Sequence, residues 1–279
     1  MTYRSILAYL PSPARAPQIW RCAATLAQAH EAHLTAMVVS PDFVAPYAFG
    51  AELPPQYFET PQEVLIAEVE AIRKVKDSIS HEKGIEAEWR HVEGVRSLVA
   101  DVIVEHAMSA DLVVMPQATG EEWGAWAEIP ERVILNSGRP VVVVPETLSV
   151  DTHPTRIMVA WTDSPQSARA TFDAVPLMRK AESVEVVSVK TAESGEVKRS
   201  LSVDQVALAL ARHDIKVTAA TDVREDMAVG EAILEHARER HADSLVMGCY
   251  GHSRYREALL GGVSRTILRD LSLPVLMAH

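Results

Sequence analysis

An internal repeat constrains this chain of 279 residues more than any other feature of its sequence. Asp111–Pro116 (Asp-Leu-Val-Val-Met-Pro) is echoed by Asp243–Gly248 (Asp-Ser-Leu-Val-Met-Gly), and residues 138–144 are echoed by residues 272–277. Further echoes, the Ser-Pro steps at Ser12 and Ser164 and the Glu-His-Ala triplets at Glu105 and Glu235, keep the same order. Because ordered self-similarity marks a repeated structural unit, the sequence predicts two copies of one domain.

The expected domains are residues 1–145 and residues 155–279, joined by a short linker with a proline at each end. The two Ser-Pro steps are about twenty residues further apart in the sequence than the two Glu-His-Ala triplets. The first copy must therefore carry an insertion between its Ser-Pro step and its Glu-His-Ala triplet. Residues 41–62, rich in proline and aromatic side chains, are the candidate. We expect an ordered surface loop there, with a ligand lid as the alternative.

Each copy alternates short apolar runs, typical of buried strands, with longer amphipathic segments, typical of helices. The expected strands are 6–10, 33–39, 86–91, 112–115, 141–144, 157–161, 183–189, 216–220, 245–247 and 275–277. The expected helices are 17–30, 63–83, 95–108, 129–136, 167–180, 203–212, 230–240 and 262–271, with Pro176 interrupting one of them. This pattern predicts an α/β fold of two tandem doubly wound domains, each a five-stranded parallel sheet with helices on both faces.

A glycine-rich stretch follows the fourth expected strand of the second copy. Gly248 and Gly251 end that strand, and Gly261 and Gly262 open the last helix, whose first turn also holds Ser264. Glycine lets the backbone approach a ligand closely, and a helix N-terminus offers free N–H groups that suit phosphate. The sequence therefore indicates an anion site at the carboxyl ends of the strands, with a simple tight turn as the alternative.

The pattern Gly-x2-Gly-x9-Gly, between a strand and a helix, resembles the nucleotide-binding signature of the universal stress protein family. The family has Ser or Thr after the last glycine, where this chain has Gly262, whereas Ser264 matches another hydroxyl position. The resemblance covers both copies and implies a tandem protein that binds ATP, ADP or AMP, possibly with Mg²⁺. It also implies that the last strands, 141–144 and 275–277, pair within the chain, and a further homodimer of chains is possible.

The resemblance extends the expected site to two other strands. The family has an Asp after its first strand, where this chain has Thr162 with Asp163 one residue later, and backbone near Val189 is expected to meet adenine. Turn and N-cap chemistry is the alternative explanation for Thr162 and Asp163.

The first copy lacks the signature. Pro116, Thr119, Ala127 and Glu128 occupy the four glycine positions. Proline removes an N–H donor, and a carboxylate at the helix N-terminus takes the place of phosphate. We therefore expect no phosphate site in this copy.

Composition narrows the remaining possibilities. A formal net charge of -11 argues against non-specific binding to nucleic acid. There is no apolar run long enough for a transmembrane helix, and the N-terminus has no signal-peptide pattern. The two cysteines, Cys22 and Cys249, lie far apart, which favours a reducing, cytoplasmic setting. We also expect no metal site, because the histidine spacings fit one poorly.

Three functions remain open. The first is a regulatory module of the stress response that binds an adenine nucleotide in its second domain and acts on a protein partner that the sequence does not identify. The second is a slow ATP hydrolase at the same site, for which His252 is the one nearby group able to place water, since no catalytic triad or carboxylate pair stands out. The third is a scaffold that has lost nucleotide binding.

Overall fold

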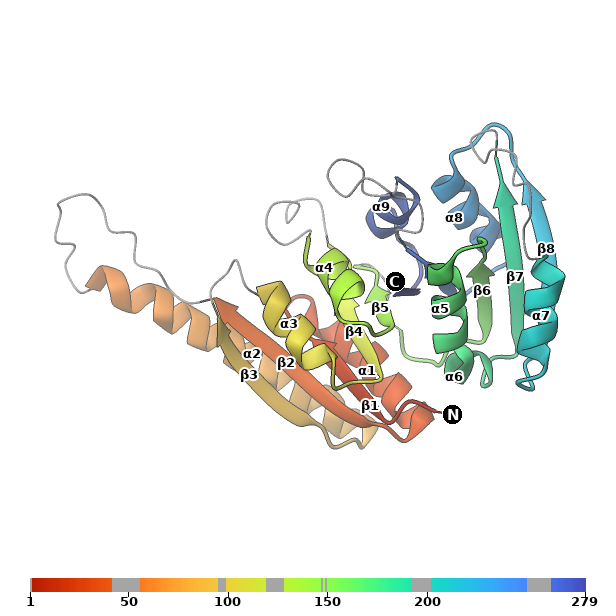
Figure 1. Ribbon diagram of the computed structural model, residues 1–279. Coiled ribbons are helices and arrows are strands. Elements are labelled where there is room, and N and C mark those ends of the chain that lie inside the picture. The colour runs from red at the N-terminus through yellow and green to blue at the C-terminus, as the bar shows by residue number, and fades with distance from the viewer. Residues whose placement is uncertain are drawn as a thin grey trace.

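The computed structural model of the chain describes residues 2–41, 56–94, 99–118, 128–146, 148, 150–191, 202–249 and 262–279. In this part of the chain, ten strands form one continuous sheet in the order β3-β2-β1-β4-β5-β10-β9-β6-β7-β8 (Figure 1). The strands are β1 (Ser5–Tyr9), β2 (His33–Pro41), β3 (Glu88–Gly94), β4 (Leu112–Pro116), β5 (Val141–Val144), β6 (Arg156–Ala160), β7 (Ser183–Lys190), β8 (Val217–Val223), β9 (Ser244–Gly248) and β10 (Val275–Ala278). We call residues 2–146 the N-terminal half and residues 155–279 the C-terminal half.

Each half contributes five strands that run parallel to one another. The halves join at the middle of the sheet, where β5 and β10 pair antiparallel and Leu276 lies opposite Val142. This confirms the expected pairing of the two last strands. Because β1 adjoins β4 and β6 adjoins β9, each half has one place where the strand order reverses, and the doubly wound α/β fold is confirmed.

Helices cover both faces of the sheet. They are α1 (Ala16–His30), α2 (Gln56–Lys83), α3 (Val99–Ala107), α4 (Glu128–Asn136), α5 (Pro165–Asp173), α6 (Val175–Met178), α7 (Val203–Ala211), α8 (Val229–Glu239) and α9 (Gly262–Arg269). The buried side chains of α1, α2, α5, α6 and α7 share one apolar core, and those of α3, α4, α8 and α9 share the other. The sheet is thus enclosed between two helical layers, as apolar runs without polar alternation predict.

Strand β1 shows how one run of sequence supplies both cores. Ile6, Ala8 and Leu10 belong to the first core, whereas Leu7 and Tyr9 belong to the second, and all five are at most 2% exposed. Successive side chains of a strand point to opposite faces, so an uninterrupted apolar run fits only a strand that is covered on both sides.

The repeated aspartates have the same role in both halves. The carboxylate of Asp111 accepts backbone hydrogen bonds from Arg4 N (2.7 Å) and Ser5 N (3.0 Å). The carboxylate of Asp243 accepts the corresponding bonds from Thr155 N (2.8 Å) and Arg156 N (2.9 Å). Each aspartate therefore ties the start of the fourth strand of its half to the start of the first.

Two expectations about helices are settled by the structure. Pro176 does interrupt its helix: α5 ends at Asp173, and Pro176 lies in the first turn of the short helix α6. The expected loop over residues 41–62 is wrong in its last part, because α2 already begins at Gln56. The alternative interpretation, a ligand lid, concerns the rest of the insertion. Residues 42–55 of that insertion lie outside the described part of the chain.

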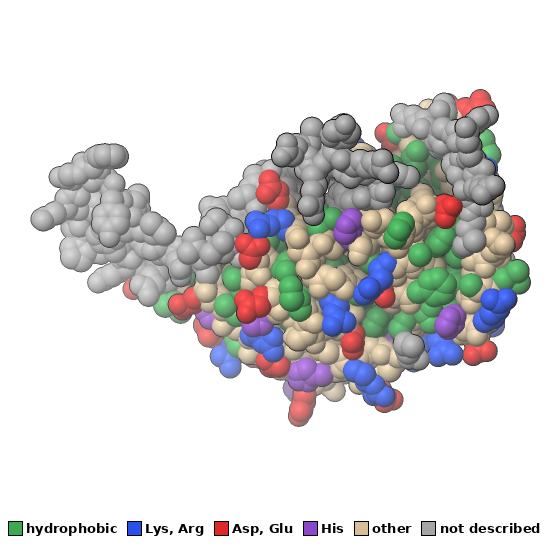
Figure 2. Space-filling model, viewed as in Figure 1, with side chains coloured by type: hydrophobic (Ala, Val, Ile, Leu, Met, Phe, Trp, Pro, Cys, Tyr) green, Lys and Arg blue, Asp and Glu red, His purple; other side chains and the backbone are tan. Residues whose placement is uncertain are grey.

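No described helix is long and apolar enough to cross a membrane. On the face seen in Figure 2, Lys and Arg side chains are interspersed with Asp and Glu side chains. The excess of negative charge in the sequence is therefore not gathered into one acidic field on that face.

Candidate functional site

The candidate site of the C-terminal half begins where β6 ends. Trp161 N still donates to Val187 O of β7 (2.8 Å), and the chain then turns through Thr162 and Asp163, both of which are exposed. Ser164 caps α5, since its hydroxyl accepts from Ser167 N (3.1 Å). The turn and N-cap chemistry expected as an alternative is therefore present at Ser164, one residue after Asp163.

The hydroxyl of Ser167 holds this turn against the helix, because it accepts from Thr162 N (3.2 Å). Ser167 itself is 1% exposed. These bonds hold the turn at the carboxyl end of β6, where Thr162 and Asp163 are exposed. Their hydroxyl and carboxylate groups are of the kind that bind sugar hydroxyls.

Gly248 ends β9 directly beneath the first turn of α5. A Cβ atom at this position would lie 2.3 Å from Ser167 N, 2.4 Å from Gln166 C and 2.6 Å from Ser167 Cα. All three are backbone atoms, so no side chain fits between strand and helix. The glycine that begins the signature is thus required by the contact between β9 and α5, a role that the sequence alone did not indicate.

The last helix contributes a second group of predicted residues. Gly262 is exposed at the start of α9, and a Cβ atom there would meet no atom of the described residues within 4 Å, whereas Ser264 is 4% exposed. Helix α9 packs on α8, because a Cβ at Gly230 would lie 2.8 Å from Thr266 Cβ and 3.4 Å from Val263 O. Gly230 therefore serves the packing of two helices.

The structure brings some predicted residues together and leaves others apart. Thr162 and Gly248 meet through Ser167, and Val189 is half-buried on β7, two residues beyond the carbonyl that receives Trp161 N. No contact among the described residues joins Gly262 or Ser264 to them. The predicted residues Gly251, Gly261 and His252 lie outside the described part.

Cys249, which follows Gly248, is 1% exposed, and its thiol lies 3.3 Å from Ala278 O. Burial raises the pKa of this thiol to about 12. A buried thiol of this kind is shielded from oxidants, so the burial of Cys249 fits a small residue that fills the turn.

At the corresponding place in the N-terminal half lies a buried side chain that the sequence analysis missed. Arg15 occupies the position of Ser167, since Arg15 N is 3.4 Å from Ser12 Oγ just as Ser167 N is bonded to Ser164 Oγ. The Arg15 side chain is buried, donates from Nη2 to Gln117 O (3.2 Å) and pairs through Nη1 with Glu146 (3.3 Å). Aligning the two repeats through their Ser-Pro steps would have revealed it.

Gln117, beside Arg15, connects the two halves. Its amide Nε2 donates to Leu268 O (3.0 Å) and Arg269 O (2.8 Å) at the end of α9, and its Oε1 accepts from Glu146 N (3.3 Å). The carbonyls at a helix C-terminus lack partners within the helix. A residue of the N-terminal half thus caps the helix whose other end carries Gly262.

The sequence analysis also missed a cluster of titratable side chains centred on His236 of α8. His236 lies between two carboxylates, with Nδ1 3.0 Å from Asp222 Oδ2 and Nε2 2.9 Å from Glu185 Oε2. The cluster ties α8 to β7 and β8. No group of three or more His, Cys, Asp or Glu residues in the described part has the arrangement of a metal site.

Comparison with known proteins gives a family match for the C-terminal half. Residues 154–279 match the model of the universal stress protein family. A curated universal stress protein of Synechocystis sp. is 41% identical over 46 residues, a match that spans 16% of this chain and 16% of that protein.

Solved structures resemble the chain over nearly its whole length. A universal stress protein from Archaeoglobus fulgidus has a TM-score of 0.71 at 17% identity, covering 98% of this chain and 95% of its own. A putative universal stress protein from Pseudomonas aeruginosa has a TM-score of 0.53 at 13% identity, covering 99% of this chain and 93% of its own. At these identities the likeness shows the fold. Residues 154–279 thus match the universal stress protein family model, and the fold of the whole chain resembles that of solved universal stress proteins.

Proposed function

We propose that residues 1–145 and 155–279 are two domains and that the second binds an adenine nucleotide, ATP or its products ADP and AMP. The observation that carries this proposal is the contrast between the two places where the strand order reverses. In the N-terminal half, the buried guanidinium of Arg15 bonds to Gln117 O just beyond β4, whereas in the C-terminal half the smaller side chain of Ser167 takes this position and bonds to Thr162 N. We therefore assign the ligand to the second place, which carries no buried arginine.

The residues present fit the parts of a nucleotide. Thr162 and Asp163 offer a hydroxyl and a carboxylate for the ribose, and the backbone near Val189 lies on the adjacent strand. The start of α9 has exposed backbone at Gly262, which suits phosphate. Mg²⁺ would come with the phosphates, because this cation is commonly held by phosphate oxygens and water.

The test introduces into the second domain the residue found in the first. Gly262→Glu copies Glu128, and space at Gly262 is open, so the fold should be retained. An acidic residue at a helix N-terminus also stabilises the helix slightly. We expect the carboxylate to repel phosphate and to weaken ATP binding by at least about tenfold, measured by calorimetry with ATP, ADP and AMP, each with and without Mg²⁺.

Two matched variants complete the experiment. Gly262→Ser restores the hydroxyl of the family pattern and should strengthen binding, whereas Glu128→Gln in the N-terminal half should leave binding unchanged. Absence of ATP binding to the native protein at millimolar concentration would contradict the proposal and favour the scaffold. Equal affinity of the native protein and Gly262→Glu would place the nucleotide elsewhere.

The proposed role is regulatory, in a stress response, with a protein partner not yet known. We place the protein in the cytoplasm, because its two cysteines are free and buried, and we propose that it binds neither membrane nor nucleic acid. We also propose a possible homodimer of chains, for which the edge strands β3 and β8 of the ten-stranded sheet are available. Light scattering would detect such a dimer.

Hydrolysis at His252 is the alternative function. Phosphate release that His252→Ala abolishes, while ATP binding persists, would support it.

A further inference from the structure

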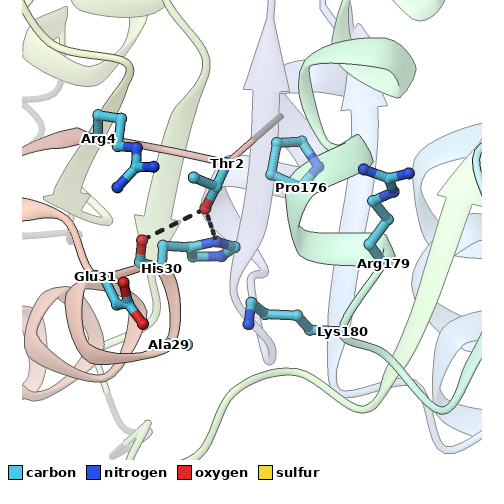
Figure 3. Close-up of a pocket in the computed structure, with 8 residues that line it drawn as sticks. All are labelled: Thr2, Arg4, Ala29, His30, Glu31, Pro176, Arg179 and Lys180. Carbon is cyan, nitrogen blue, oxygen red and sulfur yellow. Dashed lines mark hydrogen bonds between the residues drawn. The ribbon is translucent and has the colours of Figure 1, made fainter.

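A pocket separate from the proposed nucleotide site lies where the amino end of β1 meets the ends of α1 and α6 (Figure 3). It has a volume of about 400 Å³, within the range of small-molecule sites. The N-terminal half lines it with Thr2, Arg4, His30 and Glu31, and the C-terminal half lines it with Arg179 and Lys180. Any ligand in it would touch both halves.

His30 lines this pocket and carries an unsatisfied polar atom. The residue is 3% exposed, its Nδ1 lies 2.9 Å from Thr2 Oγ1, and its Nε2 is buried without a hydrogen-bond partner. Figure 3 shows the imidazole extending from α1 into the space between Thr2 and Lys180. A buried polar atom without a partner typically costs about 1–3 kcal/mol, so a ligand that satisfies it gains binding free energy.

The charges around the pocket favour an anion. Three cations, Arg4, Arg179 and Lys180, face one carboxylate, Glu31. Arg179 is engaged elsewhere, with Nε donating to His213 O (2.9 Å) and Nη2 3.3 Å from Asp214. In the described part of the chain, Arg4 and Lys180 make no ion pair, and both are exposed, so their charges remain to be matched by a ligand.

We propose that this pocket binds a small phosphate-bearing anion, held by Arg4 and Lys180 and by a hydrogen bond from His30 Nε2–H. In this tautomer of His30 the Thr2 hydroxyl donates to Nδ1. The volume exceeds what a single inorganic phosphate needs, which favours a diphosphate or a phosphate monoester. Because Arg4 and Lys180 come from different halves, the anion clamps the halves together. This site is independent of the proposed nucleotide site.

The experiment titrates inorganic phosphate and pyrophosphate into the full chain by calorimetry at low salt, where charge interactions are least screened. The variant Arg4→Gln/Lys180→Gln removes both charges at exposed positions, so it should fold normally, as a circular-dichroism melt will check. We expect saturable pyrophosphate binding that is at least about tenfold weaker in this variant. In the native protein, pyrophosphate should also shift the ¹⁵N resonance of His30 Nε2.

Gly262→Glu is the control that separates the two sites. It should leave pyrophosphate binding unchanged, even though it weakens ATP binding. Pyrophosphate binding that survives Arg4→Gln/Lys180→Gln, or that is lost in Gly262→Glu, would overturn the proposal. The absence of saturable binding of both phosphate and pyrophosphate to the native protein would overturn it as well.

Discussion

Gly248→Ala tests why the signature begins with a glycine. The new methyl group would lie 2.3–2.6 Å from three backbone atoms of α5, whereas non-bonded carbon atoms prefer about 3.5–4.0 Å. The first turn of α5 must therefore move by about 1 Å. Inserting one methyl group into a packed interior typically costs about 1–3 kcal/mol.

The displacement also reaches hydrogen bonds that hold the turn. Ser167, the residue nearest to the new methyl group, donates to Ser164 Oγ and accepts from Thr162 N. Losing an N-cap bond costs about 1 kcal/mol. We therefore expect Gly248→Ala to lower the free energy of unfolding by about 2–4 kcal/mol, measured by urea denaturation followed by circular dichroism, with nucleotide absent.

Gly262→Ala is the matched control, because a Cβ atom there meets nothing within 4 Å. It should change the free energy of unfolding by less than about 1 kcal/mol, since an alanine near a helix start alters little but local propensity. If Gly248→Ala proved as stable as Gly262→Ala and lost only nucleotide affinity, the packing explanation would be refuted, and the glycine would serve the ligand alone.

Two further predictions concern stability. Gln117→Leu leaves the carbonyls of Leu268 and Arg269 without their partner and should lower the free energy of unfolding by about 1–3 kcal/mol; a urea midpoint equal to that of the native protein would contradict the capping role. Burial, followed by the charges of His153 and Lys180, lowers the pKa of His30 from 6.5 to about 4. Between these two pH values the unfolded chain therefore binds more protons than the folded chain. The free energy of unfolding should fall as the pH decreases through this range, by up to about 3 kcal/mol. Urea midpoints between pH 7 and pH 4 should therefore drop less in His30→Gln than in the native protein, and parallel curves would disprove this assignment.

Local patterns in the sequence were sufficient to predict the architecture. Short apolar runs and amphipathic segments located the strands and helices, and the repeated Asp111 and Asp243 marked equivalent strands. The pairing of β5 with β10 followed from the family resemblance and is confirmed. The strands and helices could be predicted because their periodicity depends on neighbouring residues. The start of α2 at Gln56 was missed, because proline and aromatic residues there suggested a loop.

What the side chains do at the site depended on tertiary structure. The sequence by itself determined that a glycine follows β9, but only the approach of α5 explains why no other residue fits there. Likewise, Arg15 is distant in sequence from Gln117 and Glu146, and His30 is distant from Lys180. Periodicity indicates which face of an element is buried, whereas contacts between distant elements arise only when the sheet brings their ends together. The buried contacts of Arg15 and the pocket between the halves therefore became visible only in the folded chain.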